Sequence, residues 1–431
     1  MNNNVNNNES EIKKEDNQVN ETSSAHTGGS HGSGHHSSHR SRRHHHSRRK
    51  RKAIKLNNKI MWAITLSLLA ILTVFVVVFE VVDPYNHNLD DTQMGEVSSD
   101  ILVIDVINSD GILVKDAIRK YLLTDLLNSS NADVIPSTFY DGDGRLDEQV
   151  PVGLKLSTKD SSGLSYKIEL ADNERFEGAT VSYIDGASGT HEFKNLYSNT
   201  QYYYRVTVYT RSGVASRTGS FKTADTPRIL SIDGLSNVRD IGNWRTEGGK
   251  RIKQGLLIRG TEMDGAVESG YHLTNEGLKM MLDLLGIKTD IDLRAQTPTS
   301  MDALGSRVSH KYYDMEMYSG IFTDAGKEKV RAVFSDLANP DNYPIYLHCT
   351  YGCDRTGTIC YLLEAVLGVS RGDCLRDYGL SNMKIANIKM VEEGLKEYGG
   401  DTLKEQAEAY LISCGVSEYQ IESIRNIFLA E

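Results

Sequence analysis

Hydrophobic and polar positions follow different patterns along the chain, and each pattern predicts a different kind of element. Residues 1–59 show no apolar periodicity, so this segment is predicted to be a disordered tail. Residues 60–79 form an uncharged, largely apolar run of twenty positions. At about 1.5 Å per residue this run spans the roughly 30 Å of bilayer hydrocarbon, so it predicts a transmembrane helix.

Short runs of alternating polar and apolar residues begin near Val150, separated by polar or glycine-containing turns. Strands at such spacing are typical of a β-sandwich, which we predict for residues 146–224. Residues 80–145 are predicted to be a stalk or linker with one amphipathic helix between Ile118 and Leu127. The clearest strand-like runs are 154–156, 166–170, 180–184 and 202–209.

Residues 225–431 are predicted to be an α/β domain, in which strands converge on one loop and helices pack around them. The predicted strands are 255–259, 288–293 and 344–348, and the predicted helices are 275–285, 355–367, 371–380, 384–398, 402–413 and 417–429.

Charge changes sign across the predicted membrane helix. The tail 1–59 carries a net charge of +7, and the rest of the chain carries −17. After residue 59 the next basic residue is Lys115. The positive-inside bias therefore predicts a cytoplasmic N-terminus, a single-pass cell-membrane protein and an extracellular C-terminal region. The acidic balance of that region argues against nucleic acid as a partner.

Two polar clusters resemble metal sites but are interpreted otherwise. Eight of the thirteen histidines lie between His26 and His46, in a tail without fixed geometry, which favours a solvated segment over a metal site. The run from Asp141 to Asp147 resembles a calcium loop, but Arg145 takes a ligand position and the terminal glutamate is missing, which favours a polar turn. No metal or cofactor is predicted.

The chemistry of the C-terminal region centres on one loop. The apolar run 344–347 predicts a buried strand, and apolar residues at helical spacing follow until Gly368. Cys349 stands at the end of the strand and Arg355 at the start of the helix, with five residues between them. The loop curls its amide hydrogens toward the helix N-terminus, which predicts a site for a phosphate dianion.

The residue types in this loop suit phosphoryl transfer. The positive electrostatic field of the loop amides and the helix N-terminus also stabilises the Cys349 thiolate. Arg355 can hold two phosphoryl oxygens. Gly352 permits the turn, Thr356 can donate a hydrogen bond to the sulfur, and His348 orients the loop from behind. The predicted phosphate-binding residues are Thr350, Tyr351, Gly352, Cys353, Arg355 and Thr356.

Residues 348–357 resemble the HCxxGKDRTG loop of bacterial cysteine-dependent tyrosine and phosphoinositide phosphatases. Further matches to these phosphatases follow in the expected order over residues 228–431. They are Asn237–Gly242 with NFRDLGG, Leu257–Gly260 with YRSG, Gly286–Arg294 with LGIxTVIDLR and Asp377–Asn382 with DYLLSN.

The predicted β-sandwich has a resemblance of its own. Leu196–Tyr202 and Gly219–Thr223 resemble segments of fibronectin type III domains, although Ser198 stands where proline is usual. Such a domain could be a spacer, or it could bind a protein or carbohydrate ligand.

The resemblance implies a phosphatase in which Cys349 is the nucleophile and Arg355 binds the transferred phosphoryl group. Two carboxylates compete as general acid. Asp354 matches the aspartate proposed for this role in the family, whereas Asp314 lies where other cysteine phosphatases carry theirs. Asp354 is favoured. Supporting roles near the loop are expected for His348, Asp240 and Arg259, while Asp292 and Arg294 are expected to tie strands together.

Substrate choice depends on one departure from the family pattern. Cys353 replaces the lysine of GKDRTG, which removes a cation suited to substrates with several phosphates. The sequence therefore favours phosphotyrosine in a protein, or a small phosphomonoester, over phosphoinositides. The alternative from another class is a weakly catalytic surface or adhesion module that binds phosphorylated ligands.

Overall fold

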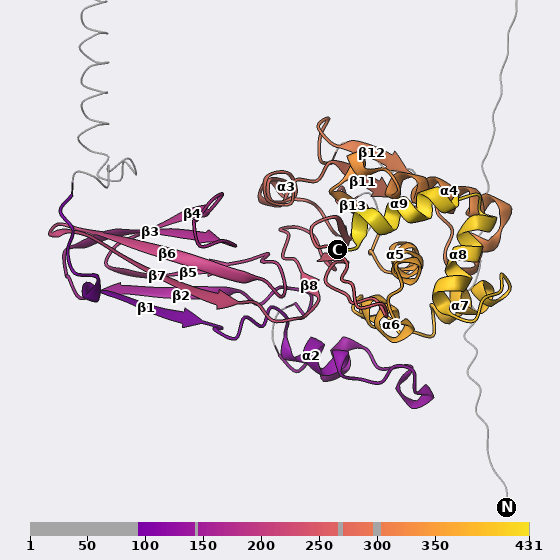
Figure 1. Ribbon diagram of the computed structural model, residues 1–431, viewed down its shortest axis with the longest axis horizontal. Helices are drawn as coiled ribbons and strands as arrows, with labels where there is room; N and C mark the ends of the chain where they lie inside the picture. Colours follow the sequence, from indigo (N-terminus) through magenta and orange to yellow (C-terminus); the bar gives the residue numbers. More distant parts are fainter. Residues whose placement is uncertain (1–93, 143–144, 266–269, 296–302, 431) are drawn as a thin grey trace, which may run out of the picture. The chain divides into compact units, whose positions relative to one another are not determined.

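The computed structural model describes residues 94–142, 145–265, 270–295 and 303–430, all within one compact unit that spans residues 88–431 (Figure 1). The predicted tail 1–59 and the predicted membrane helix 60–79 lie outside the described residues. Within the described ranges, no helix has both the length and the apolar character needed to cross a bilayer.

Two antiparallel sheets form the N-terminal part. One has the order β1-β2-β5 and the other β4-β3-β6-β7. Alternate residues of β6, such as Tyr202, Tyr204 and Val206, are buried between the sheets because neighbouring strand residues point to opposite faces. The strands are β1 (Leu102–Ile107), β2 (Val152–Thr158), β3 (Gly163–Ala171), β4 (Thr180–Asp185), β5 (Ser188–Phe193), β6 (Gln201–Thr210) and β7 (Gly213–Lys222).

The hydroxyl of Tyr202 accepts a hydrogen bond of 2.9 Å from the backbone N–H of Tyr197. Such a contact of a tyrosine hydroxyl with the backbone a few residues upstream is called a tyrosine corner and occurs in many β-sandwiches. The fibronectin type III assignment, and any ligand of the sandwich, stay predictions.

The predicted linker 80–145 is more structured than its sequence suggested. Strand β1 pairs with β2 from Leu102 opposite Thr158 onward, so the sandwich begins before the predicted boundary at 146. The partner strand lies far along the chain, so the short run carries no local signal. Helix α2 (Asp116–Leu122) ends earlier than expected and buries Ile118 in the core of the C-terminal domain. Three 3₁₀ turns occur in the same region, η1 (Ser99–Ile101), η2 (Ser129–Asn131) and η3 (Pro136–Phe139).

A mixed sheet of order β12-β11-β13-β10-β9-β8 organises the C-terminal domain. Strands β10 to β13 run parallel to one another, while β8 and β9 are antiparallel. Three of these strands match the predicted ones, and their residues are buried throughout. The strands are β8 (Arg228–Ile229), β9 (Arg239–Asp240), β10 (Leu257–Gly260), β11 (Thr289–Asp292), β12 (Ser309–Tyr312) and β13 (Ile345–His348).

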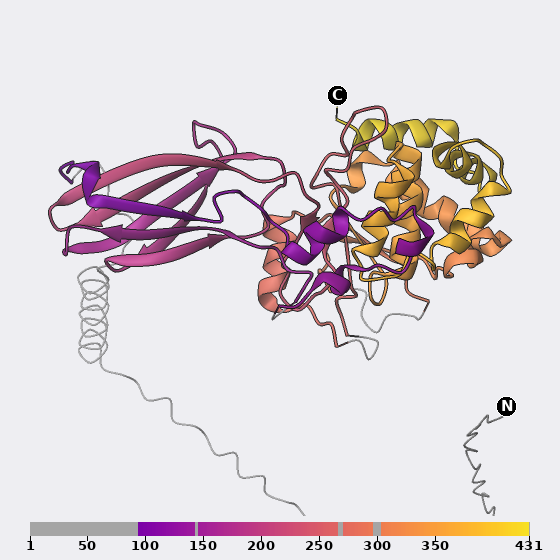
Figure 2. The same ribbon diagram turned by 90° about the horizontal axis from the view of Figure 1, so that it is seen from below.

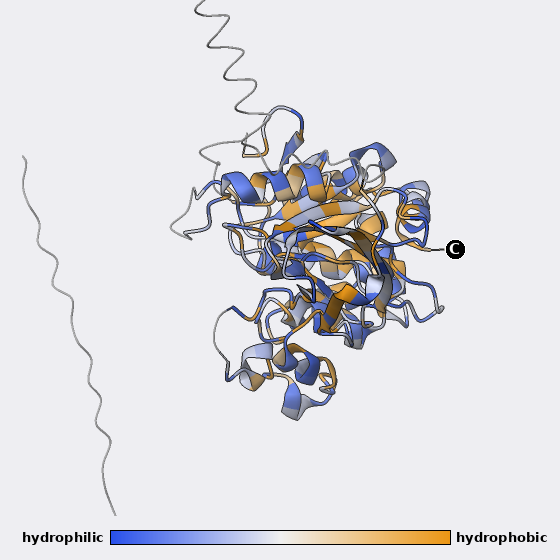
Figure 3. Cartoon of the chain, turned by 90° about the vertical axis from the view of Figure 1, so that its left-hand side faces the viewer, coloured by the Kyte–Doolittle hydropathy of each residue, from blue (hydrophilic) through white to orange (hydrophobic). Residues whose placement is uncertain are grey.

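Helix α5 (Asp354–Leu367) lies at the centre of the helices in Figure 1 and is buried from Thr356 to its end. Figure 2 shows the segment around α2 lying across the helices of the C-terminal domain, and Figure 3 shows hydrophobic residues on the inner strands and helix faces. The sequence did not predict α4. The other helical elements are α3 (Asn275–Lys279), the π-helical turn η4 (Met280–Leu284), η5 (Tyr318–Phe322), α4 (Asp324–Leu337), η6 (Pro340–Asn342), α6 (Arg371–Gly379), α7 (Lys389–Lys396), α8 (Leu403–Ser413) and α9 (Glu418–Phe428).

Candidate active site

Cys349 and Arg355 lie at the two ends of one tight loop between β13 and α5, where the sequence placed them. Ile345, Tyr346 and Leu347 are fully buried in the sheet, so the strand fixes the start of the loop. Helix α5 begins at Asp354 and is anchored by its buried apolar residues. The loop is therefore held between two rigid elements.

The carbonyl groups of the loop point outward, because each one accepts a hydrogen bond from a surrounding donor. Since a trans peptide places its C=O and its N–H on opposite sides, the amide hydrogens of residues 350–353 point into the loop. The four donors are His348 Nδ1 to Cys349 O (3.2 Å), Glu262 N to Thr350 O (3.1 Å), Asn237 Nδ2 to Tyr351 O (3.0 Å) and Arg259 Nη2 to Gly352 O (2.8 Å).

Gly352 makes the turn of this loop possible. Its φ angle is +65°, a region that residues with a side chain rarely occupy. A Cβ atom at this position would lie 2.3 Å from the carbonyl oxygen of Gly260 in β10. The loop therefore approaches β10 closely enough to exclude any side chain here.

The Cys349 side chain is set up as a thiolate. Only 3% of the residue is exposed, and burial by itself raises the pKa of a thiol. The hydroxyl and amide of Thr356, with Arg355 and His348, outweigh burial, so the pKa of Cys349 lies below its usual value. The Thr356 hydroxyl is buried without another hydrogen-bond partner among the described residues, which leaves it to the sulfur.

A charged histidine supports the thiolate from behind. Burial alone would lower the pKa of His348, but its Nε2 lies 3.1 Å from Asp290 Oδ1, and the charges of Asp290 and Asp292 raise the pKa to about 9. His348 also donates from Nδ1 to the carbonyl of Cys349. These contacts place His348 behind the loop, and its orienting role stays a prediction.

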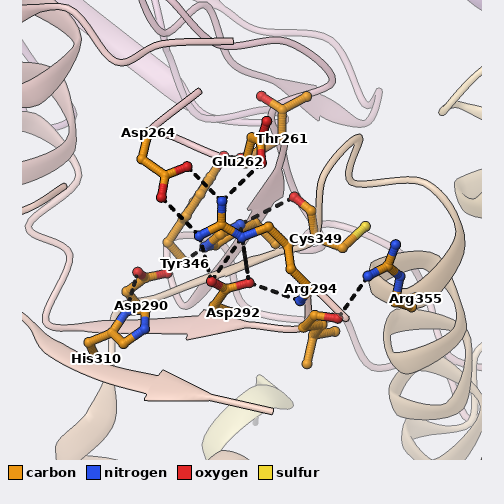
Figure 4. A network of polar contacts seen from close by, with 12 residues as sticks. Thr261, Glu262, Asp264, Asp290, Asp292, Arg294, His310, Tyr346, Cys349 and Arg355 are labelled. Carbon is orange, nitrogen blue, oxygen red and sulfur yellow. Dashed lines mark hydrogen bonds and ion pairs between the residues drawn. The ribbon is translucent and has the colours of Figure 1, made fainter. Parts of the chain in front are cut away.

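Arg355 extends from the start of α5 toward the mouth of the loop. Its Nη1 donates to the carbonyl of Leu293 over 3.4 Å, and its buried Nε has no partner among the described residues. Figure 4 shows the sulfur of Cys349 on the side of Arg355. The guanidinium is thus not consumed by an ion pair in the described structure and can bind phosphoryl oxygens.

Arg294, unlike Arg355, is fully engaged in ion pairs. It is almost fully buried and forms ion pairs with Glu262 (2.9 Å), Asp264 (2.6 Å) and Asp292 (2.7 Å), as Figure 4 shows. These contacts join the ends of β10 and β11. Asp292 and Arg294 therefore tie strands together, in agreement with the expectation.

Arg259 contacts the loop through a network whose centre the sequence analysis did not single out. The buried carboxylate of Asp377 in α6 accepts from Arg259 Nη1 (2.8 Å) and from Arg239 Nε (3.1 Å). Arg239 in turn donates to Asn237 Oδ1 (2.6 Å). The signal for Asp377 and Arg239 was present in the two motif segments that contain them, but spacing alone could not show that they meet.

Asp240 does not support the loop, contrary to the sequence-based expectation. It pairs with Arg228 at 2.9 Å and accepts from the backbone N–H groups of Gly242 (2.8 Å) and Gly255 (2.6 Å). Neighbouring residues of a strand point to opposite faces, so Arg239 faces the loop and Asp240 faces away. Its role is to fasten the antiparallel edge of the sheet.

The two candidate acids lie in different surroundings. Asp354 stands at the first position of α5, beside Arg355, and accepts a hydrogen bond from the Tyr318 hydroxyl. Burial raises the pKa of Asp354, and Arg355 opposes this shift. Asp314 has a half-exposed side chain, 3.9 Å from Lys329. Only Asp354 belongs to the loop.

Within the described residues, no three His, Cys, Asp or Glu side chains are grouped so that they could hold a metal ion. The histidine-rich tail lies outside these residues. In the predicted polar turn, Arg145 pairs with Asp147 at 2.9 Å.

Comparisons with known proteins agree with this geometry. Residues 230–430 match the family model described as "Tyrosine phosphatase family". A protein of Cupriavidus necator named "Putative tyrosine-protein phosphatase" is 31% identical over 189 residues, which covers 37% of this chain and 65% of the relative. This chain thus spans less than two thirds of the length of that relative.

Solved structures give a weaker likeness. The core catalytic domain of the PP-IP phosphatase SIW14 from S. cerevisiae, in complex with citrate, aligns with a TM-score of 0.25 and 13% identity, over 42% of this chain and 87% of that chain. A second structure of the Siw14 catalytic core gives a TM-score of 0.27 and 13% identity, over 42% and 92%. The family match spans the loop and all of its supports except Asp147, so the loop geometry and the sequence similarity fall in the same part of the chain.

Proposed function

We propose that this protein hydrolyses phosphotyrosine and related phosphomonoesters through a cysteinyl-phosphate intermediate. One observation carries the proposal: the loop from Cys349 to Arg355 joins a stabilised thiolate, inward-facing amides and a guanidinium that forms no ion pair with any described residue. These groups supply the nucleophile and the charge stabilisation that phosphoryl transfer requires.

In the first step the Cys349 sulfur attacks phosphorus, and the bond from phosphorus to the ester oxygen breaks. Arg355 and the loop amides follow the phosphoryl oxygens as charge moves onto them. Asp354, protonated, donates its proton to the departing phenoxide or alkoxide. The product is a free alcohol and a phosphorylated Cys349.

In the second step a water molecule attacks the phosphorylated cysteine. Asp354, now a carboxylate, takes the proton of that water, and the bond from sulfur to phosphorus breaks. Thr356 stabilises the departing thiolate, because its buried hydroxyl has no other partner among the described residues. Phosphate leaves, and the protons and charges return to the starting state.

The preference for a single phosphate rests on position 353. Cys353 stands where the resembled family carries lysine, and its thiol donates weakly to the carbonyls of Tyr351 (3.3 Å) and Ser381 (3.8 Å). A neutral thiol offers no attraction to a second phosphate. Higher kcat/KM for phosphoinositides than for phosphotyrosyl peptides would contradict this preference.

The proposal extends to location. A basic tail, the uncharged run 60–79 and the acidic remainder suggest a single-pass protein whose catalytic domain faces outward. Protease treatment of intact cells tests this arrangement. Digestion of the C-terminal domain is expected, whereas its protection would place the domain in the cytosol.

The central test is a substrate panel with the full-length protein and its Cys349→Ser variant. Wild type is expected to release phosphate from phosphotyrosyl peptides, and the variant is expected to release none above background. Phosphate release by the variant at the wild-type rate would contradict the cysteinyl intermediate. Binding of phosphopeptides without turnover by either protein would favour the binding module instead.

A further inference from the structure

A cavity of about 340 Å³ lies beside the catalytic loop and has no part in the steps above. It meets the loop at Tyr351 and Cys353, and neither Cys349 nor Arg355 lines it. One wall belongs to the tyrosine phosphatase family domain. The other wall comes from the segment that precedes β2, outside the matched residues 230–430, and consists of Ile118, Ser137, Tyr140, Leu146 and Asp147.

This outer wall is fastened to the catalytic domain. Asp147 accepts hydrogen bonds from the Ser236 hydroxyl (2.6 Å) and from the backbone N–H of Asn237. Arg145 donates to the carbonyl of Leu235 over 2.7 Å. The segment that Figure 2 shows against the helices is therefore held by specific polar contacts.

The same contacts connect the wall to the phosphate-binding loop. Asn237, whose φ angle of +53° is unusual for a residue with a side chain, is held by Asp147 at its backbone. Its side chain donates to the carbonyl of Tyr351 over 3.0 Å. The position of the cavity relative to the phosphate-binding loop is thereby fixed, as a subsite for one substrate requires.

The described residues that line the cavity present apolar surface, and none of them is an unpaired cation. Its apolar residues are Ile118, Leu146, Ile229, Val238 and Leu380. The Tyr351 and Tyr271 rings, 6.3 Å apart at their centres, stand edge to face at its rim.

The charged residues of the lining are already paired. Arg239 donates to Asp377, Asn237 and Ser381, and Asp147 pairs with Arg145. A second phosphate would find no unpaired guanidinium there. An uncharged, apolar group would bury its surface at little cost.

We propose that this cavity binds an apolar side chain next to the phosphotyrosine of a peptide substrate, and that Leu146 is one of the residues that set this preference. The inference rests on the proposed phosphatase function and names its substrate class. Because the outer wall lies outside the family domain, the N-terminal segment would act as a specificity element of the enzyme.

The test uses two phosphotyrosyl peptides that differ only in the residues flanking the phosphotyrosine, leucine in one and lysine in the other. Full-length wild type is expected to prefer the leucine peptide by about tenfold in kcat/KM, the effect typical of an apolar pocket. In Leu146→Glu the ratio is expected to fall to one or below, since bound leucine would remove water from the new carboxylate without replacing its hydrogen bonds, whereas lysine would pair with it. Leu146→Ala introduces no charge, and it is expected to lower the ratio several-fold because it removes apolar surface from the cavity.

Leu123→Glu provides the matched control. Leu123 belongs to the same segment, but it is 86% exposed and does not line the cavity, so this variant is expected to keep the wild-type ratio. p-Nitrophenyl phosphate has no flanking residue, so its rate of hydrolysis is used to normalise each preparation for its content of active enzyme. A wild-type ratio near one, or an unchanged ratio in both Leu146 variants, would overturn the inference while leaving the phosphatase proposal standing. Absence of any phosphate release by wild type would overturn both.

Discussion

The Tyr318 hydroxyl donates a hydrogen bond to the Asp354 carboxylate, and it lies 3.0 Å from the hydroxyl of Tyr378. Burial raises the pKa of Asp354, against the effect of Arg355. A carboxyl group with a raised pKa keeps its proton closer to neutral pH, as a general acid must. The raised pKa that burial gives Asp354, and not the hydrogen bond from Tyr318, favours Asp354 over Asp314 as the proposed acid.

Asp354→Asn is expected to lower kcat on phenyl phosphate by about 10²-fold to 10³-fold, because asparagine cannot give a proton to the leaving phenoxide. The loss should be smaller for p-nitrophenyl phosphate, whose leaving group needs less protonation. Steady-state kinetics on both esters measure the difference. Asp314→Asn is the control and should retain wild-type kcat, so a large loss in that variant alone would reassign the acid.

Tyr318→Phe is expected to move the alkaline limb of the pH profile. Activity falls as pH rises through the pKa of the acid, because Asp354 then loses the proton that it donates. A hydrogen bond to the carboxylate stabilises the charged form, so its removal should raise the pKa of Asp354 further and shift this limb upward by up to about one pH unit. The kcat profile of wild type and variant measures the shift, and a shift toward lower pH would contradict the argument.

Thr356→Val is expected to make the Cys349 thiolate harder to form. The Thr356 hydroxyl is one of the groups that lower the pKa of Cys349 against the effect of burial, so its loss should raise that pKa and move the midpoint of alkylation to higher pH. Alkylation by iodoacetamide between pH 5 and pH 9, followed at the Cys349 peptide by mass spectrometry, gives the midpoint for each protein.

Thr358→Val is the matched control for this experiment. Thr358 is buried two residues further along the same helix, and its hydroxyl donates to the carbonyl of Asp354 at 2.9 Å. Its alkylation midpoint should equal that of wild type. Equal midpoints for all three proteins would show that the hydroxyl of Thr356 does not act on the sulfur.

The sequence was sufficient for the parts of the site that are local. Cys349, Gly352 and Arg355 lie within one strand, loop and helix, so their spacing alone predicts that they converge. The buried strands β10, β11 and β13 were also predicted, but only β13 continues a plainly apolar run, since β11 carries two aspartates. Their order in the sheet, by contrast, depends on pairings between distant residues.

The supports of the loop could not be derived from spacing, since they come from distant parts of the chain. Asp377 reaches Arg239 across 138 positions, and Asp147 reaches Asn237 across 90. The error at Asp240 has the same origin, because the segment suggested proximity but not which face of β9 each side chain takes. Strand β1 was not predicted, because its pairing partner β2 follows the end of the predicted linker 80–145.

Asp377→Asn is expected to be the most destabilising single change in the site. The Asp377 carboxylate, 1% exposed, is the shared counter-charge of Arg239 and Arg259, so its neutralisation leaves two buried guanidinium groups uncompensated. Breaking a buried pair in this way costs about 3–5 kcal/mol. Denaturant unfolding at pH 7 measures the loss, and kcat should fall with it because Arg259 holds the carbonyl of Gly352.

The effect of Asp377→Asn should depend on pH in one direction. Burial opposes the charged form, but Arg239 and Arg259 prevail and lower the pKa of Asp377 below 3.8 in the folded state. Its stabilisation is therefore complete above the unfolded pKa of about 4 and is lost as pH falls toward the folded pKa. The stability difference between wild type and variant should be constant from pH 6 to pH 8 and shrink below about pH 4. Asp373→Asn, which removes a partly exposed partner of Arg376, should cost about 1 kcal/mol or less, so an equal cost for both variants would show that Asp377 does not carry the network.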